Sequence, residues 1–164
     1  MRFAAALVVA LLPVGGIAHA DADRFGWPLR PATPVVTRLF DTPTPDWRRG
    51  HRGVDLAGVP GQPVFAAGPG TVVFAGVLAG RPVVSIAHPG GLHTSYEPVA
   101  AVVKPGQRVD ATSPLGRLQA GHAGCPVPAC LHWGAMWGPA QRADYVDPLG
   151  LLAATPVRLK PMTG

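Results

Sequence analysis

The segment PVVSIAHPGGLHTSY (residues 82–96) contains two runs of β-forming residues on either side of the turn sequence Pro89-Gly90-Gly91. A turn of this kind between two such runs predicts an antiparallel hairpin. Further short apolar runs predict strands at 34–40, 54–57, 64–67, 71–75, 114–118 and 130–136. The one helical turn that we expect is at 147–152, with Pro148 near its start. We therefore expect an all-β fold, a compact antiparallel β-sheet domain with very little helix.

The composition also favours a single β-rich domain with many turns. The chain has 164 residues, of which 21 are Gly and 20 are Pro. We divide it into a leader (1–20), a β-domain (21–152) and a C-terminal tail (153–164). The formal net charge of +5 favours an anionic partner such as a cell-wall polymer, or reflects only an Arg-rich genome. Because no basic cluster is interleaved with aromatic residues, we expect no nucleic acid partner.

The first twenty residues have the pattern of a secretory signal peptide. Arg2 supplies a positive charge, residues 3–17 are almost wholly apolar, and Ala18-His19-Ala20 matches an A-x-A cleavage site. The apolar run is short for a membrane span. We expect the mature chain to begin near Asp21, to lack a membrane span, and to be secreted into the extracellular, cell-wall or periplasmic space.

The two cysteines lie close together in CPVPAC (125–130). In an oxidising compartment, two nearby thiols are expected to form a disulfide, here Cys125–Cys130. The closed loop is short, so this bond would stabilise the fold by about 2 kcal/mol. The alternative is that Cys130 is a zinc ligand beside His132.

Two histidines and one aspartate offer the ligands of a catalytic zinc site. HRGVD (51–55) places the His51 imidazole and the Asp55 carboxylate four residues apart, and CLHW (130–133) contains His132. Three such ligands leave a fourth position for water or substrate. The spacing alone is a weak signal, because surface and turn positions often hold the same residue types.

Five motifs follow one another along the chain: HRGVD (51–55), PVFAAGPGTVVFAG (63–76), GGLHTSY (90–96), KPGQRV (104–109) and LHW (131–133). Together they resemble the lysostaphin-type, or LytM-like, zinc metallopeptidases, and the resemblance covers residues 28–152. It implies an antiparallel β-domain with an open groove in which His51, Asp55 and His132 hold Zn²⁺. It also implies that the substrate is the peptide part of bacterial peptidoglycan.

Two positions depart from the pattern of that family. Its T-x-Y-x-H-L segment corresponds to TSYEPV (94–99), where Pro98 replaces the histidine. Its H-x-H motif corresponds to CLH (130–132), where Cys130 replaces the first histidine. The resemblance therefore implies that both usual catalytic histidines are replaced. General-base help is worth about 10²–10⁴-fold in rate, so another residue would have to supply it.

Three residues are candidates for the missing catalytic roles. His122 precedes the last ligand in a loop, and we rank it first as the base; otherwise it is a surface histidine. Glu97, the only glutamate in the chain, ranks second, because strand alternation turns it away from the groove side that we assign to Tyr96 and Pro98. The hydroxyl of Tyr96 is a candidate for orienting substrate or stabilising an oxyanion. The alternative is that Tyr96 is a half-buried strand residue with a structural role.

These residues lead to three functional hypotheses. The first is a secreted zinc endopeptidase that acts on peptidoglycan peptides in cell-wall remodelling, and the intact ligand set favours it. The second is a catalytically weak or inactive homologue that binds cell wall or regulates another wall hydrolase, and the replaced histidines favour it. The third is a structural β-domain stabilised by zinc. No feature of the sequence indicates a particular oligomeric state.

Overall fold

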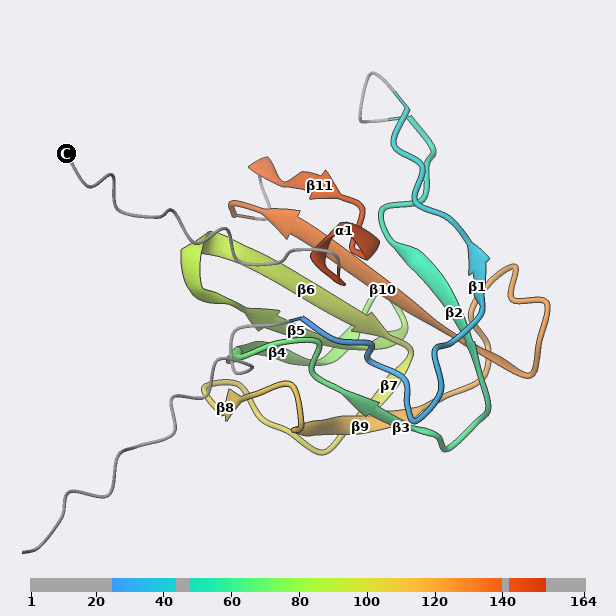
Figure 1. Ribbon diagram of the computed structural model, residues 1–164, viewed down its shortest axis with the longest axis horizontal. Coiled ribbons are helices and arrows are strands. Elements are labelled where there is room, and N and C mark those ends of the chain that lie inside the picture. The colour runs from blue at the N-terminus through green and yellow to red at the C-terminus, as the bar shows by residue number, and fades with distance from the viewer. Residues whose placement is uncertain (1–24, 44–47, 140–141, 153–164) are drawn as a thin grey trace, which may run out of the picture.

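The computed structural model describes residues 25–43, 48–139 and 142–152, which form two antiparallel sheets (Figure 1). The larger sheet contains, in spatial order, β1 (Val36–Arg38), β2 (Val54–Gly58), β10 (Ala129–Trp137), β6 (Leu92–Glu97), β5 (Arg81–Ala87), β4 (Gly70–Leu78) and β8 (Arg108–Val109), with β11 (Asp144–Val146) paired to the end of β10. The smaller sheet contains β3 (Pro63–Phe65), β9 (Pro114–Leu118) and β7 (Val99–Ala101). Figure 1 shows the paired strands β6 and β10 crossing the centre of the molecule.

The predicted all-β antiparallel fold with very little helix is confirmed. The hairpin of β5 and β6 turns through the 3-10 turn η1 (Pro89–Gly91), and the short helix α1 (Leu149–Leu152) follows Pro148. The strands β7, β8 and β11, of two or three residues each, were not predicted. Within the described residues, no helix is both long and apolar enough to cross a membrane. The expected leader (1–20) and tail (153–164) lie outside the described residues.

Strand register separates the large sheet into a buried face and an open face. Residues directly opposite one another on antiparallel strands project from the same face. Trp133 on β10 lies opposite Val54 on β2 and Tyr96 on β6, and all three are fully buried. They join one core cluster with residues of the smaller sheet, including Val64, Val99, Leu115 and Leu118. His132, the neighbour of Trp133, therefore projects from the opposite, open face.

Tyr96 lies in this core rather than in the groove where the sequence analysis placed it. Its hydroxyl accepts a hydrogen bond from the backbone N–H of Ala67 at 2.9 Å and lies 2.9 Å from Thr94 Oγ1. Thr94 Oγ1 is also 2.7 Å from His88 Nε2. Burial raises the pKa of Tyr96 to about 12. The hydroxyl thus links β6 to the segment after β3, on the buried face of the large sheet.

Substitution Tyr96→Phe should lower the free energy of unfolding by about 1–3 kcal/mol, because it leaves the buried N–H of Ala67 without an acceptor. Urea unfolding monitored by tryptophan fluorescence measures this change. The control is Tyr145→Phe at the only other tyrosine of the chain, which is partly exposed on β11. The control should change stability by less than about 0.5 kcal/mol. Equal unfolding midpoints for the two variants would contradict the structural role of the Tyr96 hydroxyl.

Candidate metal centre

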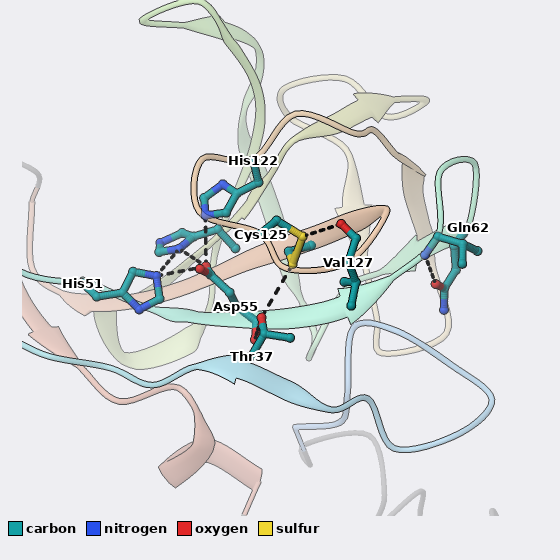
Figure 2. Close-up of a disulfide and its surroundings, with 10 residues drawn as sticks. Thr37, His51, Asp55, Gln62, His122, Cys125 and Val127 are labelled. Carbon is teal, nitrogen blue, oxygen red and sulfur yellow. Dashed lines mark hydrogen bonds and ion pairs between the residues drawn. A yellow bond between two sulfur atoms is a disulfide. The ribbon is translucent and has the colours of Figure 1, made fainter.

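Three histidines and one aspartate gather on the open face of the large sheet (Figure 2). One ring nitrogen each of His51, His122 and His132 and one carboxylate oxygen of Asp55 all lie within 4.8 Å of one another. Asp55 Oδ1 is 2.9 Å from both His51 Nε2 and His132 Nδ1. The same oxygen is 3.1 Å from His122 Nε2. The fold therefore brings together the three predicted ligands and places His122 beside them.

The backbone fixes three of these residues before any metal binds. His132 on β10 lies directly opposite Asp55 on β2, so both side chains project from one face. His51 is held just before β2 by two backbone hydrogen bonds to Asp41, of 2.6 and 2.9 Å. Gly53 lies between the first two ligands, where a Cβ atom would come within 2.7 Å of His132 Nε2. Any larger residue at this position would displace that imidazole.

The hydrogen bond that His51 makes to the backbone leaves its other ring nitrogen free to face a cation. His51 Nδ1 lies 2.7 Å from the carbonyl oxygen of Leu39, which can only accept, so Nδ1 carries the proton. In the neutral ring, Nε2 then turns a lone pair towards Asp55 Oδ1 at 2.9 Å and His132 Nδ1 at 3.0 Å. Such converging lone pairs are satisfied by a divalent metal ion. The carbonyl of Leu39 also fixes the orientation of the ring, as the outer hydrogen bond to a ligating histidine does.

The Asp55 carboxyl stays ionised although its side chain is only 2% exposed. Burial by itself raises the pKa of this group, but the polar contacts of the carboxylate with the rings of His122 and His132 and the proximity of His51 hold the pKa well below its usual range. Imidazole nitrogens together with one carboxylate are the donors that zinc takes in catalytic sites. The residues present therefore fit a metal ion.

His122 reaches the cluster from the loop between β9 and β10. Its ring stacks on that of His132, with centroids 5.5 Å apart and an angle of 27° between the planes. Pro98 and Cys130 do occupy the two motif positions, but a third imidazole lies beside the ligands. The expectation of a site whose catalytic histidines are both replaced is therefore not borne out. The only signal for His122 in the sequence is its place in the loop before the last ligand.

Glu97 lies on the open face, contrary to the expectation from strand alternation. It is directly opposite His132, so the two side chains share a face. The expectation was wrong because it assigned Tyr96 to the groove, and alternation then turned Glu97 away. The Glu97 carboxylate accepts a hydrogen bond from Arg81 Nη1 at 2.7 Å and is not part of the four-residue cluster. Glu97 is thus one half of an ion pair beside the metal centre.

The cluster lies in an open groove that crosses the large sheet. Along β4 and β5 the lining is mostly apolar, although Arg81 also comes from β5. Beside the cluster, Arg38 lies opposite Asp55, and Arg52 follows His51 in the chain. The lining includes Phe74, Leu78 and Val83 on the apolar side and Arg38, Arg52 and Arg81 among the basic residues. The groove therefore leaves one side of the metal centre open, with basic side chains close to it.

The two cysteines form the predicted disulfide. Cys125 lies in the same loop as His122 (Figure 2). Its partner Cys130 lies on β10. Because the bond uses both sulfur atoms, the alternative in which Cys130 is a metal ligand beside His132 is wrong.

Comparison with known proteins agrees with this geometry. The model of Peptidase family M23 matches residues 49–148, a range that contains all four residues of the cluster. An uncharacterized protein of Mycobacterium tuberculosis is 69% identical over 146 residues, which are 89% of this chain and 58% of that protein. The chain therefore spans less than two thirds of the length of this relative.

Solved structures show the same fold. Helicobacter pylori Csd3 is 26% identical with a TM-score of 0.63, over 85% of this chain and 37% of that one. Lysostaphin of Staphylococcus simulans is 24% identical with a TM-score of 0.61, over 80% of this chain and 58% of that one, and this identity supports likeness of fold alone. The family match covers more than half of the sequence and includes the whole cluster. The chain belongs to peptidase family M23.

Proposed function

We propose that the protein is a zinc metalloendopeptidase that cleaves peptidoglycan peptides in cell-wall remodelling. The observation that carries this proposal is the cluster of three imidazoles and one carboxylate in an open groove. Membership of a peptidase family supports the class of reaction. The groove also contains Arg38, which lies opposite Asp55 on the neighbouring strand and suits a substrate with free carboxylates, as cell-wall peptides have.

We assign the metal to His51, Asp55 and His132, which leaves a coordination position open for water or substrate. When bound, Zn²⁺ supplies Lewis acidity, which polarises a scissile carbonyl and lowers the pKa of water to about 7. The protein positions its three ligands in advance through strand pairing and through the carbonyl of Leu39. Preorganised ligands of this kind bind without a cost of rearrangement.

We assign His122 the role of general base. Its Nε2 lies beside the three assigned ligands, 3.1 Å from Asp55 Oδ1, and its ring stacks on that of His132. From there it can take a proton from water and pass it to the leaving amine. A fourth protein ligand would close the site, whereas a base beside three ligands leaves it open. Glu97 ranks second, because Arg81 already engages its carboxylate.

We also propose that the protein acts outside the cytoplasmic membrane. This rests on the leader pattern of residues 1–20, which lie outside the described residues. The oxidised pair Cys125–Cys130 is compatible with an oxidising compartment. The alternative, an inactive homologue that binds cell wall or regulates another hydrolase, drew its support from the missing catalytic histidines. The presence of His122 in the cluster removes most of that support.

Removal of one ligand should abolish metal binding. The wild type should bind one Zn²⁺ per chain and lose thermal stability on chelation, because a metal that binds only the folded state stabilises it. His132→Ala should bind no stoichiometric zinc and should not respond to chelator. His93→Ala is the matched control, since this histidine lines the same groove outside the cluster. Elemental analysis and thermal unfolding measure both effects, and full occupancy in His132→Ala would refute the ligand assignment.

Removal of the base should affect catalysis and leave the metal in place. His122→Ala should lower kcat for hydrolysis of purified muropeptides by about 10²-fold or more, with zinc content unchanged. Glu97→Gln should lower kcat by less than about 10-fold, because Glu97 is engaged by Arg81 and lies outside the cluster. Both variants are assayed at matched zinc occupancy. Loss of zinc from His122→Ala would instead identify His122 as a ligand, and a larger effect in Glu97→Gln would reverse the ranking.

A further inference from the structure

The loop that carries His122, residues 119–128, has few attachments to the rest of the domain. Near its start, the N–H of Gln119 donates to the carbonyl of Pro98 at 2.9 Å, and its end continues into β10. Across the described part of the chain, the other polar or covalent links from this loop to the domain are made by His122 itself and by the disulfide of Cys125. The position of His122 therefore depends on very few restraints.

Within the loop, the backbone holds His122 by a single long hydrogen bond, from the N–H of Cys125 to the His122 carbonyl at 3.3 Å. Gly121 precedes His122 with a φ of 100°, and Gly124 follows two residues later with a φ of 80°. These angles are readily available to glycine, and glycine also loses the most conformational freedom when it is ordered. An imidazole between two such residues needs an external restraint to stay at one point.

The disulfide attaches the loop to β10 at a position close to the metal centre. Cys130 is fully buried on β10 and precedes His132 by two residues, so both side chains project from the same face about 7 Å apart along the strand. His122 is thus three residues from the anchored Gln119 and three from the anchored Cys125. Without the disulfide, the next anchored residue would be Ala129, seven residues after His122.

We propose that the Cys125–Cys130 disulfide is a positioning element that holds the His122 imidazole against the metal centre. The proposal rests on the proposed function, in which His122 is the base. Cys130 does no chemistry with the substrate; it acts through His122 by shortening the tether of the loop. Because a displacement of about 1 Å in a catalytic group can cost about 10²-fold in rate, loss of this tether should be visible in kcat.

The double variant Cys125→Ser/Cys130→Ser tests the proposal. Its kcat on muropeptides should fall by about 10²-fold, while its KM changes by less than about 3-fold. Its zinc content should equal that of the wild type, because the three ligands lie on β10, on β2 and just before β2. In zinc-loaded protein with ¹³C-labelled histidine, the ring protons of His122 and His132 should show a nuclear Overhauser effect, which the double variant should lose.

A second variant keeps the disulfide and lengthens the tether. Insertion of two glycines after Gly124 should lower kcat and weaken the same Overhauser effect, with the disulfide still present by mass spectrometry. The control for lost stability is Ile86→Val in the core, away from the loop. It should keep both kcat and the Overhauser effect.

The outcomes separate this proposal from the proposed function. An unchanged kcat and a retained Overhauser effect in both loop variants would overturn the positioning role. A higher kcat in the double variant would also overturn it, because the loop would then be obstructing the metal centre. If the wild type cleaves no muropeptide, the proposed function fails, and the Overhauser effect alone still decides whether the disulfide positions His122.

Discussion

The pairing of His132 with Asp55 across β10 and β2 is the constraint on which the rest of the site depends. The same register places Trp133 opposite Val54 and Tyr96 in the core, so burial of a large aromatic side chain and exposure of a metal ligand are set by one arrangement. A slip of one residue would exchange the two faces, with His132 in the core and Trp133 in water. Packing of the core therefore also fixes the metal centre.

The site combines two kinds of support. Its three proposed ligands are held by strand pairing and by backbone hydrogen bonds, and they form a rigid set. His122 comes from a loop that has its own covalent restraint, the Cys125–Cys130 disulfide. Proton transfer requires an imidazole at a particular position, and any backbone segment that places it there can supply it. A loop residue can therefore do the work of a strand residue, provided that its position is restrained.

The sequence predicted those features that local chemistry encodes. The hairpin of β5 and β6 follows from its turn residues, and the disulfide follows from the short spacing of the cysteines. The sequence analysis assigned the wrong face of β6 to the groove. Thr94 and Tyr96 are polar, but they lie in the core, where their hydroxyl groups form a hydrogen bond with each other. The alternate residues His93, Ser95 and Glu97 are more polar than Thr94 and Tyr96. This difference in polarity was the signal in the sequence that could have identified the open face. The contact of His122 with Asp55 joins residues 67 positions apart, and no local pattern encodes such a contact.

The most direct test of the account is digestion of purified muropeptides by the metal-free protein and by the same protein reconstituted with one equivalent of zinc. Mass spectrometry of the products locates the bond that is cut. The account predicts hydrolysis of a peptide bond with zinc, no hydrolysis without it, and intact glycan in both samples. Muropeptides that remain whole in the presence of protein with full zinc occupancy would contradict it.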